Sequence, residues 1–336
     1  ERLEALRARL SLIGQIVGPA TGDVFRLADL AAMWTFTTGR PTKEMQDLAE
    51  AFRSEAISGD LKKGSLVEPD PGHEMLADRE LGGLGKVMLD GSFEHRAFVH
   101  QDAVRISPDG ATTLPHFSYE DDGAPQWESR DLEFVLALPE GEPPVEGWPV
   151  VIFQHGLGGD RGEIFYFASL YASMGMASVG VDAHLHGARA AKGSSGGEHF
   201  FSSDFFATRD NIRQSVLDLV ALTRFVREGL DEALASELGQ SDGAHVLATD
   251  SLLFHGVSTG GIIGSLFLAV EPTVSRAVLS VTGGHLLRIF AHAGDESLNK
   301  PISGALEALG VEPGTPEHER FLDKARWIAE RADPIS

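Results

Sequence analysis

The chain of 336 residues contains no cysteine. This absence excludes a disulfide framework, a thiolate metal site and a cysteine nucleophile, and it is compatible with either an oxidising or a reducing compartment. Basic residues are few, because 28 lysines and arginines stand against 50 acidic residues, which gives a net charge of −22. This surplus of negative charge argues against nucleic acid and anionic membrane surfaces as partners.

Long apolar runs are also missing. No stretch of about 18 apolar residues occurs, so the sequence predicts no membrane-spanning helix. The length suffices for one large α/β domain, or for one domain with an appendage. The chain begins at Glu1 without a methionine or a visible signal peptide, and we expect this start to be a cut or processed end.

The first 84 residues mix helical and strand patterns. Leucines recur at helical spacing in residues 1–16, and a second amphipathic helix is expected over residues 43–56. Residues 32–38 are rich in β-branched and aromatic side chains, which predicts a strand, and residues 61–84 are typical of a loop. We expect residues 1–84 to be an accessory region, the end of a truncated β-rich domain.

Strands dominate the next part of the chain, and an alternation of strands and helices follows it. Strands are expected over residues 85–100, 103–114, 131–138, 149–154, 177–181, 252–254 and 276–281. Helices are expected over residues 164–174, 209–229, 262–270 and 316–331. Because the later strands are spaced by helices, the sequence predicts an α/β fold with a mostly parallel sheet and right-handed crossovers.

A G-x-S-x-G motif stands between a predicted strand and a predicted helix. Gly256 and Gly260 flank Ser258 at this spacing. In such a context the motif is a nucleophile elbow, a strained turn that holds the serine hydroxyl above the sheet. The N–H of Thr259, at the start of the helix, would then face a developing oxyanion. The alternative is a glycine-rich turn that ends an ordinary βα unit.

A second glycine-rich motif follows the strand expected over residues 149–154. It begins with His155, Gly156 and Leu157 and continues with two further glycines. Together with the serine motif it resembles the α/β-hydrolases, in which the loop after the first long parallel strand donates the second oxyanion N–H. The resemblance implies an α/β-hydrolase domain over residues 85–336, with Leu157 as the second donor beside Thr259. His155 would brace this loop.

A narrower resemblance connects the chain with bacterial secreted or lipoprotein lipases and esterases that carry an N-terminal β-sandwich region. It rests on residues 34–38, 147–153 and 209–214. The resemblance implies a small-molecule or lipid ester as substrate, no cofactor, and an extracellular or outer-membrane location in a bacterium.

The base that would activate the serine is not evident. A serine hydroxyl needs a histidine to take its proton and a carboxylate to orient that histidine. The histidines after the serine are His285, His292 and His318. None suits the chain order of this fold, in which the acid and the histidine follow later strands. We expect both on polypeptide beyond Ser336 that completes the site, with His292 and Asp295 as weaker candidates.

Two other groups of side chains have a structural and a functional interpretation. One comprises Phe200, Phe201, Phe205 and Phe206. Buried core is the first interpretation of this group, and an acyl pocket or lid over Ser258 is the second. The other comprises Asp182, His184 and His186. Alternating spacing is compatible with metal ligands, but hydrogen bonds to neighbouring loops are favoured, so no metal is expected.

The sequence therefore predicts a carboxylic ester hydrolase that acts through an acyl-enzyme on Ser258. A peptidase, a thioesterase or a polyester depolymerase would carry the same motifs. A noncatalytic relative that serves as a binding or scaffold protein is the alternative of a different class, and activity with a Ser258→Ala control separates the two.

Overall fold

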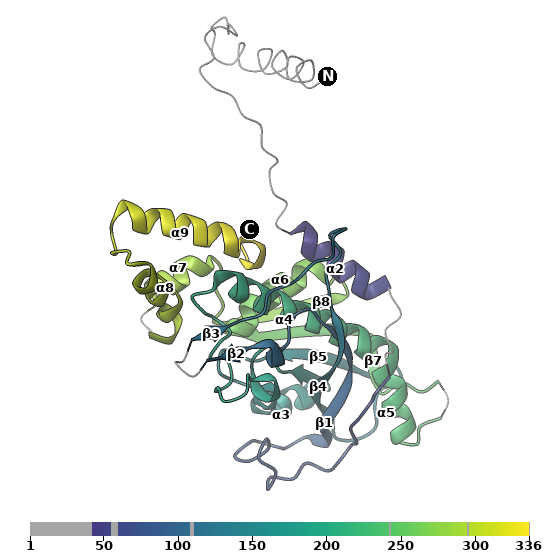
Figure 1. The fold of residues 1–336 in the computed structure, drawn as a ribbon. Helices are drawn as coiled ribbons and strands as arrows, with labels where there is room; N and C mark the ends of the chain where they lie inside the picture. Colours follow the sequence, from purple (N-terminus) through teal and green to yellow (C-terminus); the bar gives the residue numbers. More distant parts are fainter. Residues whose placement is uncertain (1–41, 55–59, 108–110, 242, 294–295, 336) are drawn as a thin grey trace, which may run out of the picture. The chain divides into compact units, whose positions relative to one another are not determined.

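The computed structural model describes residues 42–54, 60–107, 111–241, 243–293 and 296–335 (Figure 1). The helix expected over residues 1–16 and the strand expected over residues 32–38 lie outside this part of the chain. By its contacts the chain separates into residues 1–40 and a compact unit, Pro41–Ser336, which is the one described below. The division at residue 84 stays a prediction.

A six-stranded sheet, in the order β1-β4-β6-β5-β7-β8, forms the centre of the unit (Figure 1). Its strands are β1 (Leu84–Ala97), β4 (Glu128–Pro139), β5 (Trp148–Gln154), β6 (Ala177–Val181), β7 (Leu247–Val257) and β8 (Val274–Ser280). β4 runs antiparallel to β1 and β6, whereas β5, β6, β7 and β8 pair in parallel. The mostly parallel sheet expected of an α/β fold is confirmed.

Helices cover both faces of this sheet. They are α2 (Lys43–Ser54), α3 (Ala168–Ser173), α4 (Phe205–Phe225), α5 (Asp231–Glu237), α6 (Thr259–Val270), α7 (Leu286–His292), α8 (Glu296–Leu309) and α9 (Pro316–Ala329). Side chains alternate between the two faces of a strand, so neighbours enter different cores. Ile152 of β5 packs in the core under α4 and α6, and Phe153 packs in the smaller core under α3.

Some predicted elements have different bounds in the structure. The strand expected over residues 103–114 is reduced to β2 (Arg105–Ile106) and β3 (Thr112–Thr113), which pair with each other. The helix expected over residues 164–174 begins as a 3-10 segment, Arg161–Tyr166, before α3. Residues 61–84 are mostly loop, as expected, and the bridge between Val67 and Val87 attaches them to β1.

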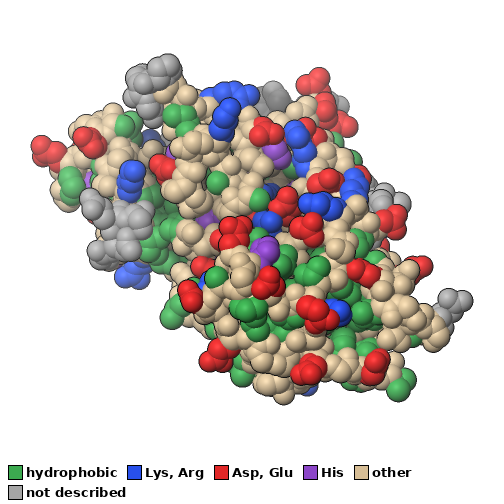
Figure 2. Space-filling model, turned by 90° about the horizontal axis from the view of Figure 1, so that it is seen from below, with side chains coloured by type: hydrophobic (Ala, Val, Ile, Leu, Met, Phe, Trp, Pro, Cys, Tyr) green, Lys and Arg blue, Asp and Glu red, His purple; other side chains and the backbone are tan. Residues whose placement is uncertain are grey.

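Acidic side chains are spread over the face shown in Figure 2 rather than gathered in one patch, with apolar side chains exposed between them. In the part of the chain that the structure describes, no helix is both long enough and apolar enough to cross a membrane.

A buried polar network joins the antiparallel half of the sheet to α4. Asp218 of α4 accepts hydrogen bonds from Arg189 and from the amide of Gln214, and it lies 2.9 Å from Nδ1 of His95 on β1. Burial alone would raise the pKa of Asp218, but Arg189 and His95 outweigh it and hold the pKa well below its usual value. The carboxylate is therefore ionised in the core.

We expect Asp218→Ala to destabilise the protein by about 3 to 5 kcal/mol, because it leaves the Arg189 charge buried without its partner. Urea unfolding measures this loss. The exposed acid of a surface ion pair, Asp250, supplies the control, since Asp250→Ala should change stability little.

The same network predicts a pH dependence. Because the folded-state pKa of Asp218 lies below its unfolded value, its contribution is complete above a pH of about 4 and is lost as the pH falls further. The difference in unfolding free energy between the wild type and Asp218→Ala should therefore shrink on acidification. A difference that stays constant down to the acid transition would contradict this role.

Candidate active site

Ser258 occupies a strained position between β7 and α6. Its backbone has φ 54° and ψ −116°, a left-handed region that residues with a side chain rarely adopt. The turn is fixed on both sides, since the Ser258 N–H donates to the carbonyl of Ser280 (2.9 Å) and its own carbonyl accepts the N–H of Gly261 (2.8 Å). The serine side chain itself is exposed. The strand, turn and helix of an elbow are thus present.

Both glycines of the motif are required by the close approach of backbone segments. A Cβ atom on Gly256 would overlap the carbonyl oxygen of Gly260. A Cβ atom on Gly260 would overlap the carbonyl oxygens of Gln154 and His155, at the end of β5. Because neither position can hold a side chain, α6 begins directly against the end of β5.

This contact places the loop after β5 beside the serine. A Cβ atom on Gly156 would stand 3.4 Å from Cβ and 4.0 Å from Oγ of Ser258. Among the described residues, the N–H groups of Leu157 and Thr259 donate to no acceptor of the protein. Two free N–H donors therefore flank an exposed serine hydroxyl, an arrangement that suits the binding of an oxyanion.

His155 orients the peptide that carries one of these donors. Its Nε2 accepts the N–H of Ala183 (2.9 Å), so Nδ1 bears the proton and donates to the carbonyl of Gly156 (2.8 Å). In a trans peptide the C=O and the following N–H point in opposite directions. By holding the Gly156 carbonyl on one side, His155 directs the Leu157 N–H to the other.

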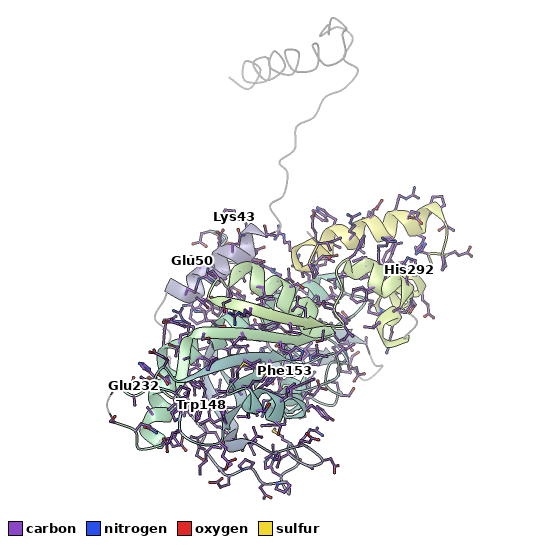
Figure 3. The ribbon with its side chains drawn as sticks, turned by 180° about the vertical axis from the view of Figure 1, so that it is seen from behind. Lys43, Glu50, Trp148, Phe153, Glu232 and His292 are labelled. Atoms are coloured by element: carbon purple, nitrogen blue, oxygen red, sulfur yellow. The ribbon has the colours of Figure 1, made fainter. Side chains whose placement is uncertain are left out.

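Within the described residues, no histidine forms a hydrogen bond with Oγ of Ser258. His285 begins α7 in a left-handed conformation, and its N–H donates to the buried carboxylate of Asp333. His318 accepts the N–H of Gly314 at the start of α9. His292 is exposed at the end of α7, among the C-terminal helices of Figure 3. Asp295 lies outside the described residues.

Asp333 is a structural residue that the sequence did not reveal. Its two carboxylate oxygens accept the N–H groups of His285 and Leu286 and so satisfy the first turn of α7. A carboxylate that caps a helix 47 residues away leaves no local signal in the sequence.

In the Asp182, His184 and His186 group, Asp182 is engaged by contacts within the protein, whereas Nε2 of each histidine is buried without a hydrogen-bond partner. Asp182 accepts the N–H groups of Arg161 (2.7 Å) and Ala188 (2.9 Å) and pairs with the Arg161 guanidinium. Burial lowers the pKa of His184 well below its usual value and that of His186 to about 4, so both rings are neutral at pH 7. The described part of the chain holds no cluster of three potential metal ligands.

Three of the four grouped phenylalanines are core residues. Phe200, Phe201 and Phe205 are buried, whereas Phe206 is 43% exposed. Phe200 packs edge-on against His186 at 4.9 Å between ring centroids, and Phe201 packs against Phe290 of α7 at 4.9 Å. A role of this group as acyl pocket or lid stays a prediction.

Comparison with solved structures identifies the fold of the chain. Acetyl xylan esterase from Paenibacillus sp. R4 superposes with a TM-score of 0.50 at 16% sequence identity, over 93% of this chain and 79% of that one. The chain has the α/β-hydrolase fold. Acetyl xylan esterase 1 from Thermoanaerobacterium sp. JW/SL YS485 matches with a TM-score of 0.47 at 16% identity, over 92% of this chain and 77% of that one.

The esterase LipA from Xanthomonas oryzae matches with a TM-score of 0.36 at 14% identity, over 70% of this chain and 53% of its own. Searches of sequence families and of curated proteins find no match to this chain.

The strain at Ser258 predicts an unusual effect of glycine at this position. At an ordinary position glycine is less stable than alanine by about 0.5 to 1 kcal/mol. At a positive φ the order reverses, so Ser258→Gly should be more stable than Ser258→Ala by about 1 kcal/mol. Urea unfolding of the two variants tests this, and a Gly variant that is less stable than the Ala variant would show an unstrained turn.

Proposed function

We propose that this protein is a serine hydrolase that cleaves carboxylic esters. The observation that carries the proposal is the exposed, strained Ser258 beside the free N–H groups of Leu157 and Thr259. In this mechanism Oγ of Ser258 attacks the acyl carbon while a base removes its proton. The two N–H groups stabilise the oxyanion, the alcohol leaves, and water releases the acyl group from the enzyme.

Catalysis by this serine needs a base, and we propose that a histidine and an acid reach it from polypeptide beyond Ser336. An uncovered strand supports this proposal. β8 is an edge of the sheet, and Val278 and the following Val281 are 59% and 83% exposed. Open edge strands are usually paired or covered, so the edge favours a further strand against β8, and the exposed valines favour a segment that covers its face. Such a strand would end beside Ser258, whose N–H already bonds to Ser280 of β8.

An apolar stripe supports the same proposal. Tyr166, Leu170 and Met174, spaced as neighbours on one side of a helix, are 62%, 56% and 55% exposed. The adjacent positions Phe167 and Tyr171 pack on His255 of β7. The stripe therefore lies beside the sheet face to which the His255 side chain points. A segment that covers this face would also bury the stripe.

A fluorophosphonate, which bonds covalently to an activated serine, tests the nucleophile. We expect a single adduct on Ser258 in a form that carries the polypeptide after Ser336, and none on its Ser258→Ala variant. Intact-mass analysis followed by peptide mapping makes the measurement. No adduct on the longer form would reject the esterase proposal and favour a noncatalytic binding protein with this fold. An adduct on residues 1–336 alone would place the base within this chain.

His155 should affect the chemical step rather than substrate binding. His155→Ala removes the hydrogen bond to the Gly156 carbonyl, so the Leu157 N–H is no longer held in its direction. We expect kcat to fall about 10²-fold and KM to stay nearly unchanged. His155→Asn keeps an N–H close to the position of Nδ1 and should retain more activity than the Ala variant. Equal losses in both variants, or a loss confined to KM, would contradict this positioning role.

A further inference from the structure

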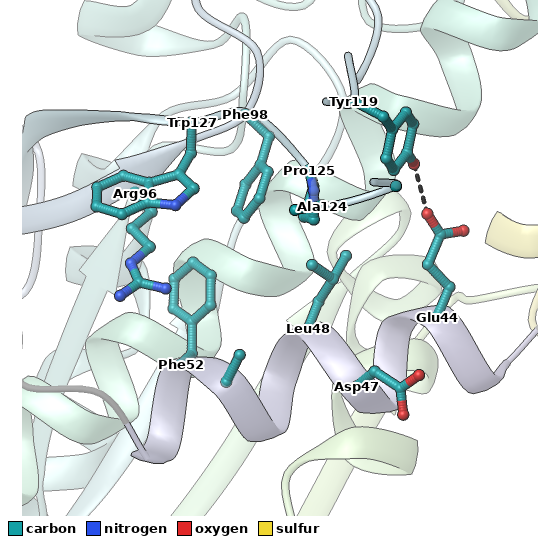
Figure 4. Close-up of a pocket in the computed structure, with 12 residues that line it drawn as sticks. Glu44, Asp47, Leu48, Phe52, Arg96, Phe98, Tyr119, Ala124, Pro125 and Trp127 are labelled. Atoms are coloured by element: carbon teal, nitrogen blue, oxygen red, sulfur yellow. Dashed lines mark hydrogen bonds between the residues drawn. The ribbon is translucent and has the colours of Figure 1, made fainter. Parts of the chain in front are cut away.

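A pocket lies between α2 and the end of β1 (Figure 4). It is a pocket of about 370 Å³, within the usual range for small-molecule sites. Its lining residues are Glu44, Asp47, Leu48, Ala51, Phe52, Arg96, Phe98, Tyr119, Gly123, Ala124, Pro125 and Trp127. None of them belongs to the elbow or to the loop after β5.

The pocket and Ser258 lie at the same end of the strands, but at strands that are not neighbours in the sheet. β4 runs antiparallel to β1 and β6. The last residues of β1 and the first residues of β4 therefore lie at the end of the sheet where β5 and β7 finish. Four strand spacings separate β1 from β7, which amounts to roughly 19 Å. The pocket is therefore separate from the proposed active site.

Four aromatic rings from three segments form its walls. Phe52 comes from α2, Phe98 follows β1, and Tyr119 and Trp127 come from the loop before β4. Tyr119 and Trp127 remain 41% and 47% exposed. The indole of Trp127 lies over the guanidinium of Arg96 at 4.2 Å, which holds the ring in place. Of the four rings, those of Tyr119 and Trp127 face solvent, whereas Phe52 and Phe98 are buried beside them.

Contacts of the lining residue Glu44 with its neighbours hold the pocket in shape. The fully buried Arg213 pairs with Asp210 and with Glu44 at 2.9 Å each, and its guanidinium stacks on Phe117 at 4.3 Å. The hydroxyl of Tyr119 donates to Glu44, which ties the loop to α2 (Figure 4). A preformed site of this kind binds a ligand with little ordering cost.

The two acidic side chains that line the pocket are paired with basic groups. Burial would raise the pKa of Glu44, but Arg213 and Arg331 reverse this effect and lower it, so the carboxylate is ionised and paired with both arginines. Asp47 is paired with Lys43, and Arg96 contributes a positive charge under Trp127. A cationic ligand therefore finds no unpaired carboxylate at Glu44 or Asp47, and the same two carboxylates repel an anionic ligand.

We propose that this pocket binds a neutral, hydroxylated ring such as a pyranose. An apolar ring face would stack on the exposed indole of Trp127, while hydroxyl groups at the ring edge donate to the carboxylates of Glu44 and Asp47. Exposed aromatic rings next to paired carboxylates suit a molecule that is apolar on its faces and polar at its edge.

Titration with methyl β-D-glucopyranoside tests the proposal, with saturation-transfer NMR as the measurement. We expect binding to the wild type and about tenfold weaker binding to Trp127→Ala. Trp327→Ala is the matched control, because Trp327 is a 74% exposed tryptophan on α9 outside the pocket, and it should bind like the wild type. Ala124→Phe fills the pocket and keeps its aromatic residues, and we expect it to abolish binding.

Charged analogues complete the experiment. The methyl glucuronide anion and the glucosamine cation should bind more weakly than the neutral glycoside. No saturation transfer to the wild type, equal binding by Trp127→Ala, or a preference for either charged analogue would overturn the proposal. Labelling of Ser258 by the fluorophosphonate should be unchanged in Trp127→Ala, so the two proposals can fail separately.

Discussion

The contact between the start of α6 and the end of β5 is the constraint on which the candidate active site depends. Gly260 lies so close to the carbonyl oxygens of Gln154 and His155 that no side chain fits between them. This contact brings Ser258 and the loop after β5 together and leaves the Leu157 and Thr259 N–H groups free. The site is thus built from backbone atoms, whose positions follow from the sheet itself.

The antiparallel half of the molecule is held by a different kind of interaction. Asp218, on the central helix α4, is buried with His95 of β1 and the charged Arg189 of the loop after β6 as its partners. Buried charges are tolerated only when they are paired. Arg213, on the same helix, repeats this arrangement beneath the aromatic pocket. One helix, α4, therefore connects the sheet, the loop after β6 and the aromatic pocket through ion pairs.

Local patterns explain what could be predicted. β5 and β6 are continuous apolar strands, and the strained turn at Ser258 follows from glycines at fixed spacing. The helices α5, α7 and α8 were not predicted, since α5 and α7 have seven residues each and Pro301 interrupts the pattern of α8. The pocket could not be foreseen, because its rings come from segments far apart in the chain. The catalytic role of Ser258 and the source of its base stay proposals.

The open edge of β8 also affects how the protein behaves in solution. An edge strand such as β8, which exposes Val278, is a template for pairing with another copy. The net charge of −22 opposes such association by repulsion between copies. Salt shortens the range of that repulsion from about 30 Å at 0.01 M to about 3 Å at 1 M. Colloidal stability while β8 is uncovered therefore depends on ionic strength, and dilute buffer keeps the chains apart.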